Sequence, residues 1–128
     1  MKNKIKKAIL AAAAIVCFST TTVMAASGTY RFSLMTGNAE YTDLVTKNNE
    51  LVYATVTCSS LNYPSAKLYY RIYDSKYALV GNDTHQGLGD FRITYTKAVH
   101  NGEKFMLRVE NPSSNGGVTV STAGNWTP

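Results

Sequence analysis

From Tyr30 onward, apolar and polar side chains alternate along most of the chain with a period of two residues. Successive side chains of a β-strand point to opposite faces of its sheet, so this alternation predicts strands with one buried face. No part of this region keeps the spacing of an amphipathic helix. With weaker stretches at 41–45 and 77–80, the pattern predicts about seven or eight strands. The clearest lie at 30–34, 52–58, 67–73, 91–96, 105–110 and 118–120.

Strands of this number and spacing are typical of a sandwich or a small barrel. We therefore expect an all-β fold, a single antiparallel β-sandwich of the Ig-like or jelly-roll-like kind. Threonine and tyrosine dominate the strands, as suits half-buried sheet surfaces. No internal repeat, linker or low-complexity tract interrupts residues 26–128, so one domain accounts for them.

One turn is expected at residues 100–102. A three-residue loop there would set Tyr95 opposite Leu107 and Ile93 opposite Val109, which unites the apolar faces of the two strands. A two-residue turn would split those faces. The three-residue loop requires its last residue, a glycine, in the left-handed conformation.

A second hairpin is expected at Asp74-Ser75. A two-residue turn there pairs Ile72 with Tyr77 and Tyr70 with Leu79. The remaining connections are rich in glycine, asparagine and serine. They are predicted as loops at 45–51, 81–89 and 111–117.

The N-terminal segment reads as a secretory signal peptide. Four lysines follow Met1 within residues 2–7, an apolar run covers 8–18, and small residues precede a cleavage position after Ala25 or Ala26. We expect residues 1–25 to be cleaved and residues 26–128 to form a secreted, extracellular domain. The residues before Cys17 lack the small side chain that a lipid-attachment site needs, and no membrane span or C-terminal sorting tail follows, so release is predicted.

Removal of that segment changes both charge and cysteine content. The net charge falls from +5 to about +1, which gives no reason to expect binding to nucleic acid or to an anionic membrane. Cys58 becomes the single cysteine, so no internal disulfide is possible. A buried thiol is expected for it, with an intermolecular disulfide as the alternative. We expect a monomer or a weak dimer.

One candidate for catalysis or metal binding is the 81–90 segment, where Asp83, His85 and Asp90 are clustered. These side chains could converge on a cation or on a polarised water, as in a small hydrolase or metal-binding protein. Their spacing matches no known ligand motif, and such residues are also common in surface loops. We therefore predict a non-enzymatic protein, with no catalytic residue and no cofactor assigned.

The candidate binding residues form a stripe on one strand. Lys67, Tyr69, Arg71 and Tyr73 would point the same way and could stack on sugar rings or hold an acidic polymer. Stacking on a glycan predicts that the two tyrosine rings are exposed and coplanar. Trp126 is the other candidate, either as an exposed stacking residue or as a core residue that closes one end of the sandwich.

A signal peptide followed by a short Thr/Tyr/Asn-rich β domain and a final Asn125-Trp126-Thr127-Pro128 resembles uncharacterised small secreted proteins of Gram-positive bacteria that end in a Trp-Ser/Thr-Pro motif. The resemblance implies an extracellular location and no particular function. The sequence favours an extracellular or cell-envelope binding module, with a cell-wall glycan or a surface protein as ligand. An effector of bacteriocin or toxin type, acting through a folded β surface, is the alternative.

Overall fold

The computed structural model describes residues 26–128, and the expected signal peptide lies outside them. Within this range the chain forms nine β-strands and one short 3₁₀ helix, η1 (Ser113–Asn115). The strands are β1 (Gly28–Leu34), β2 (Ala39–Tyr41), β3 (Val45–Thr46), β4 (Tyr53–Leu61), β5 (Lys67–Asp74), β6 (Leu79–Gln86), β7 (Gly89–Thr94), β8 (Lys104–Glu110) and β9 (Val120–Thr127).

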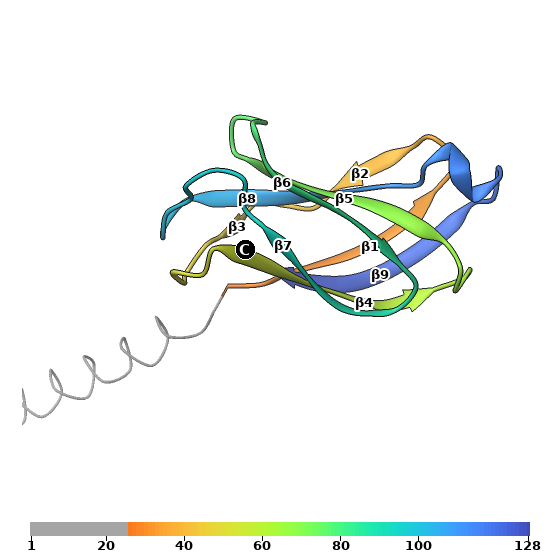
Figure 1. The fold of residues 1–128 in the computed structure, drawn as a ribbon, viewed down its shortest axis with the longest axis horizontal. Coiled ribbons are helices and arrows are strands. Elements are labelled where there is room, and N and C mark those ends of the chain that lie inside the picture. The colour runs from red at the N-terminus through yellow and green to blue at the C-terminus, as the bar shows by residue number, and fades with distance from the viewer. Residues whose placement is uncertain (1–25) are drawn as a thin grey trace, which may run out of the picture.

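The strands form two antiparallel sheets packed face to face, which confirms the predicted β-sandwich (Figure 1). One sheet has four strands in the order β1-β9-β4-β7. The other has five, in the order β2-β8-β5-β6, with β3 pairing beside β2 on β8. In Figure 1 the five-stranded sheet lies above and the four-stranded sheet below. The described residues contain no helix long and apolar enough to cross a membrane.

The loop predicted at 81–89 is wrong, because most of it belongs to β6. This strand is an edge of the five-stranded sheet, and four of the five residues from Asn82 to Gln86 are exposed. An edge strand with solvated side chains needs no apolar alternation, so its composition resembles that of a loop. Only the tight turn between β6 and β7, at Gly87-Leu88, matches the prediction.

The predicted pairing of Tyr95 with Leu107 and of Ile93 with Val109 is also wrong. Ile93 pairs with Ala54 of β4, whereas Val109 pairs with Tyr70 of β5, so β7 and β8 belong to different sheets. Two strands facing one core show the same alternation whether they are neighbours in one sheet or opposed across the sandwich.

Of the predicted three-residue turn, only the conformation of Gly102 is confirmed. The N–H of Glu103 donates to the carbonyl of His100 at 3.2 Å, and Gly102 adopts φ +88°. The glycine therefore takes the left-handed conformation expected of it, but the turn carries the chain from one sheet to the other.

The β5–β6 hairpin is confirmed as antiparallel, but its register is wrong by four residues. Ile72 pairs with Gly81 and Tyr70 with Asp83. An even shift keeps each side chain on its predicted face, so the apolar pattern alone does not discriminate between the two registers.

Asp74 accounts for the longer turn of this hairpin. Its Oδ1 accepts hydrogen bonds from the N–H groups of Lys76 at 2.8 Å and Ala78 at 2.9 Å. Between them Tyr77 adopts φ +62°, a position usually taken by glycine or asparagine. The side chain of Asp74 thus replaces the two-residue turn with a loop over 75–77.

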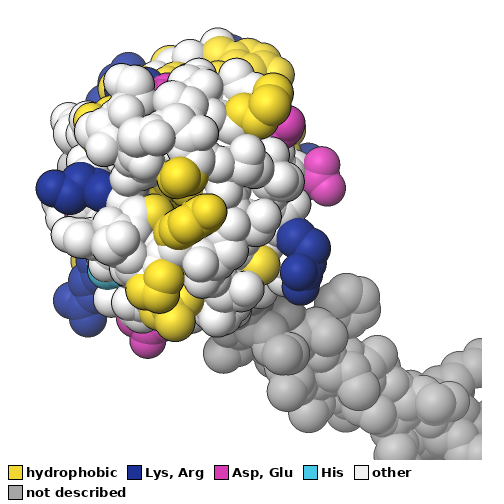
Figure 2. Space-filling view, turned by 90° about the vertical axis from the view of Figure 1, so that its right-hand side faces the viewer, with side chains coloured by type: hydrophobic (Ala, Val, Ile, Leu, Met, Phe, Trp, Pro, Cys, Tyr) yellow, Lys and Arg dark blue, Asp and Glu magenta, His cyan; other side chains and the backbone are white. Residues whose placement is uncertain are grey.

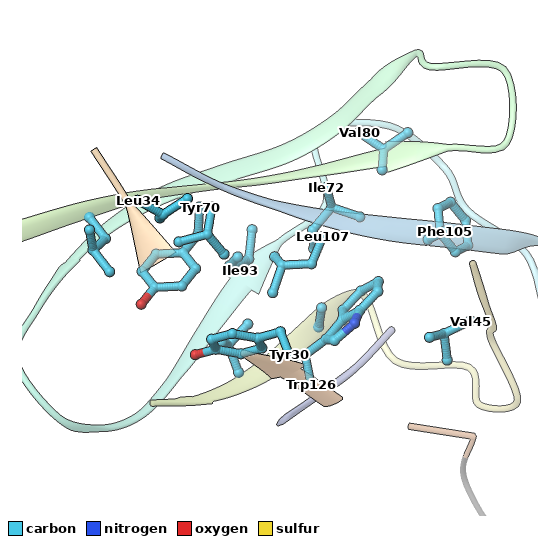
Figure 3. Packing of buried hydrophobic residues seen from close by; sticks show 14 of the residues in the cluster. Tyr30, Leu34, Val45, Tyr70, Ile72, Val80, Ile93, Phe105, Leu107 and Trp126 are labelled. Carbon is cyan, nitrogen blue, oxygen red and sulfur yellow. The ribbon is translucent and has the colours of Figure 1, made fainter. Parts of the chain in front are cut away.

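The core lies between the two sheets. Figure 3 shows Tyr30 and Trp126 of the four-stranded sheet reaching toward Ile72 and Leu107 of the five-stranded sheet. Trp126 is fully buried and is among the largest buried side chains. Cys58 is buried as predicted, with its Sγ 3.5 Å from the hydroxyl of Thr122.

The last strand, β9, runs between β1 and β4 and contacts both along most of its length. The pairing of β9 with β4 is irregular between Cys58 and Ser60, opposite Gly124. A Cβ at Gly124 would overlap the carbonyl of Thr57 and would lie 2.7 Å from the hydroxyl of Tyr30. Only glycine fits this crossing of backbone and side chain.

Gly124→Ala should therefore destabilise the domain by about 3 kcal/mol, because the new methyl group forces β9 and β4 apart. Denaturant unfolding followed by circular dichroism would measure this change. Ser121→Ala, at an exposed position of the same strand, is the matched control and should change stability by less than about 0.5 kcal/mol. Equal stability of the two variants would contradict the close packing at Gly124.

Burial raises the pKa of Tyr30, Tyr70 and Tyr95 well above the ordinary value of 10.0. The unfolded chain releases these protons near pH 10, whereas the folded domain retains them. The contribution of these three tyrosines to stability is therefore fully present below pH 10. The free energy of unfolding should fall as the pH rises beyond that value. Phenolate absorbance and circular dichroism followed in one alkaline titration should show three of the nine tyrosines ionising only with unfolding. Ionisation of all nine in a folded domain would refute this.

Candidate binding surface

The outer side of the five-stranded sheet carries the most distinctive group of side chains. On β5, Leu68, Tyr70 and Ile72 are buried in the core, so the alternate residues point outward. These outward residues are the predicted stripe of Lys67, Tyr69, Arg71 and Tyr73. Because β5 lies between β8 and β6, the stripe runs through the middle of the sheet rather than along an edge.

Neighbouring strands extend this stripe into a surface. Across β5 and β8, Tyr69 faces Glu110, Arg71 faces Arg108, and Tyr73 faces Met106. On the far side of β8, Tyr41 of β2 faces Arg108. We call the outward side chains of β2, β5 and β8, together with Tyr77, the aromatic face.

Three tyrosines cluster at one corner of the aromatic face. The ring of Tyr41 lies 5.8 Å from the ring of Tyr73 at an angle of 57°, and 5.8 Å from that of Tyr77 at 78°. Tyr41 and Tyr77 are 42% and 66% exposed, whereas Tyr69 and Tyr73 are half-buried. Met106, which points outward beside Tyr73, is nevertheless buried. Tyr41, Tyr73 and Tyr77 thus form a tilted aromatic cluster.

The charges on the aromatic face are unbalanced. It carries four basic side chains and one acidic side chain: Lys67, Arg71, Lys104, Arg108 and Glu110. All other residues from 26 to 128 together hold five basic and seven acidic side chains. The domain is close to neutral, but its positive charge is concentrated on this side of the sandwich.

Arg108 forms the single ion pair found in residues 26–128. Its Nη2 lies 2.8 Å from Oε1 of Glu110, and its guanidinium lies 6.0 Å from the ring centre of Tyr41. The Nη1 atom is buried and has no hydrogen-bond partner in the described part of the chain. Glu110 therefore satisfies only part of the hydrogen-bonding capacity of this guanidinium.

The sequence pattern does not indicate Arg108, Tyr41 and Tyr77 as members of this surface. The alternation over 105–110 does place Arg108 on an outward position, but it does not reveal which strand lies beside it. Tyr41 comes from a three-residue strand, and Tyr77 from a turn of unexpected length. No pattern in the sequence brings these residues together.

Trp126 does not belong to a ligand-binding surface, which corrects one of the two expectations for it. The residue is fully buried at 0% exposure, so its ring cannot contact a ligand. Its indole Nε1 has no hydrogen-bond partner within residues 26–128. The alternative expectation, that Trp126 completes the core, describes its position.

Asp83, His85 and Asp90 are placed on two neighbouring edge strands, each with its own partner. The N–H of Thr84 donates to Asp83, the ring of His85 stacks on Phe91 at 4.1 Å, and Asp90 accepts a 2.8 Å hydrogen bond from the hydroxyl of Thr57. No set of three or more such side chains between residues 26 and 128 is arranged to hold a metal ion.

The outer side of the four-stranded sheet has a different character. Its outward positions are mainly small hydroxyl residues, such as Thr29, Thr55 and Ser121. It also carries one tyrosine–arginine pair, in which the guanidinium of Arg92 lies 4.3 Å from the ring centre of Tyr53. This pair provides a matched control for substitutions on the aromatic face.

At the end of the sandwich that carries η1, neither hydrophobic nor charged side chains gather into one large patch (Figure 2). In Figure 2, which views this end, small hydrophobic patches are separated by backbone and uncharged side chains, and Lys and Arg side chains lie near the rim. A hollow beside η1 is lined by Tyr63, Ser65, Ala66, Ser114, Asn115 and Val118, none of which is charged.

Comparison with known proteins finds no matching family model and no matching curated sequence. Among solved structures, the chain is similar to a periplasmic inhibitor of g-type lysozyme from Aeromonas hydrophila, with 13% identity, a TM-score of 0.48, and coverage of 80% of this chain and 86% of that one. It is also similar to PirA (5% identity, TM-score 0.47, coverage 78% and 93%) and to FLHE (14% identity, TM-score 0.38, coverage 80% and 94%). These values are too low for the neighbours' activities to bear on this chain.

Proposed function

We propose that this protein is a secreted, non-enzymatic binding module whose aromatic face binds a protein partner at the cell surface or outside the cell. The observation that carries the proposal is the cluster of Tyr41, Tyr73 and Tyr77 beside Arg71 and Arg108. Tyrosine and arginine are the residue types that dominate the binding energy of protein interfaces.

The geometry of the cluster favours a protein over a glycan. Stacking on sugar rings would use flat, coplanar, exposed rings, whereas the two ring pairs here are inclined at 57° and 78°. The tilted rings, with the buried Met106 opposite Tyr73, provide an uneven surface that is partly apolar. Such a surface suits insertion of side chains from a partner protein.

The conformation of Tyr77 supports a role beyond folding. A tyrosine in the left-handed region costs about 1–2 kcal/mol relative to an ordinary backbone conformation. Strained residues of this kind are concentrated at functional sites, because selection for stability alone would replace them. This backbone conformation places the exposed ring of Tyr77 against the ring of Tyr41, where it extends the aromatic face.

The test uses a labelled domain of residues 26–128, the part of the chain that the structure describes, and isolated bacterial envelopes. We expect binding that is lost after protease treatment of the envelopes and retained after enzymatic digestion of their glycans. Tyr41→Ala combined with Tyr73→Ala should reduce binding by about tenfold or more, because two contact residues are lost. Tyr53→Ala on the opposite sheet is the control and should bind normally. Binding that survives protease treatment but not glycan digestion would show that the ligand is a glycan and not a protein.

Tyr77→Gly separates binding from folding. The substitution relieves the backbone strain of about 1–2 kcal/mol and removes an edge-on aromatic contact worth about 0.5–1.5 kcal/mol, so the free energy of unfolding should stay within about 1 kcal/mol of the parent value. Binding to the envelopes should nevertheless fall. Tyr77→Phe, which retains the ring, should bind like the parent. Unchanged binding by the glycine variant would show that the ring has no part in recognition. A loss of stability above about 2 kcal/mol would show that the ring serves the fold instead.

A further inference from the structure

At the centre of the aromatic face, two arginines lie directly opposite each other on neighbouring strands. Arg71 of β5 and Arg108 of β8 are register partners, and both point away from the core. Like charges at directly opposed positions of a sheet repel each other, so this arrangement weakens the sheet unless an anion lies between them.

The surroundings of the two arginines supply too little negative charge to balance them. Glu110 pairs with Arg108 alone, and Arg71 forms no ion pair with any residue from 26 to 128. One nitrogen of Arg108, Nη1, is buried without a hydrogen-bond partner in this range. A buried guanidinium N–H without an acceptor is unfavourable, so Glu110 leaves part of the hydrogen-bonding capacity of Arg108 unused.

Different neighbours flank the two arginines. The tyrosine ring of Tyr41 lies on one side of Arg108, 6.0 Å from its guanidinium. On the other side of β5, a shallow hollow opens beside Arg71 and is lined by Tyr69, Asn82 and Thr84 as well. Asp83 also lines the hollow, so this side of Arg71 holds one acidic residue as well.

We propose that Arg71 and Arg108 form an anion-binding site that accepts a carboxylate from an acidic segment of the partner protein. A guanidinium presents paired N–H donors that match the two oxygens of a carboxylate. The surrounding tyrosines exclude water from these hydrogen bonds and thereby strengthen them. The surplus of positive charge on this face attracts an acidic partner to it. This inference rests on the proposed protein-binding function and names the chemistry of the bound segment.

A short oligoglutamate peptide, with oligoglutamine of the same length as reference, probes the site directly. We expect the domain of residues 26–128 to bind oligoglutamate, with an affinity that falls as salt is added, and to show shifts of the Arg71 and Arg108 side-chain N–H signals in NMR spectra. Arg71→Gln should weaken this binding about tenfold. Arg92→Gln, which removes an arginine beside a tyrosine on the other outer face, should leave it unchanged.

Several outcomes would overturn the assignment. Three results would each show that the arginine pair is not an anion site. They are equal binding of oligoglutamine, an equal loss of binding in Arg71→Gln and Arg92→Gln, and absence of the NMR shifts. If inorganic phosphate or polygalacturonate binds more tightly than oligoglutamate, the site prefers an anion other than a protein carboxylate, and the proposed ligand is wrong. If envelope binding still depends on protein and on Tyr41 and Tyr73 while oligoglutamate fails to bind, the proposed function stands and this inference alone is refuted.

Discussion

The structure depends on the burial of the last strand, β9, between β1 and β4, with Trp126 at the centre of the core. A central strand forms hydrogen bonds on both edges and contributes its apolar face to the sandwich, so the four-stranded sheet is incomplete without it. Gly124 makes this insertion possible, because no side chain fits between Thr57 and Tyr30 at that point. The terminal residues Trp126 and Thr127 thus have structural roles, in the core and in the pairing with β4.

That core determines what the outer surface presents. Leu68, Tyr70 and Ile72 on β5 and Phe105, Leu107 and Val109 on β8 are all buried against the opposite sheet, which forces the alternate residues outward in fixed register. Side chains on adjacent strands of a sheet are held close together, so the register of the strands fixes the spacing of the tyrosines and arginines. A partner binding there would lose little free energy in ordering the surface, since most of it is already ordered.

Much of the fold and part of the candidate surface could be predicted from the sequence. The alternation over 67–73 places Lys67, Tyr69, Arg71 and Tyr73 on one outer face, as the structure has them. The partner of Arg71 could not be predicted, because alternation indicates the face of a residue but not its neighbouring strand. For the same reason Ile93 was matched with Val109, which also faces the core but from the other sheet. The strand β6 was missed because its exposed edge positions carry polar side chains.

By itself, the sequence determined the fold class, the buried and exposed sides of most strands, and the burial of Cys58, since these follow from local alternation of apolar and polar residues. The tertiary structure decided which strands pair, and so it decided that Tyr41, Tyr77 and Arg108 join the β5 stripe in one surface. It also decided between the two possible places for Trp126. These features depend on contacts between residues far apart in the chain, and a period-two pattern carries no information about which distant strand completes each contact.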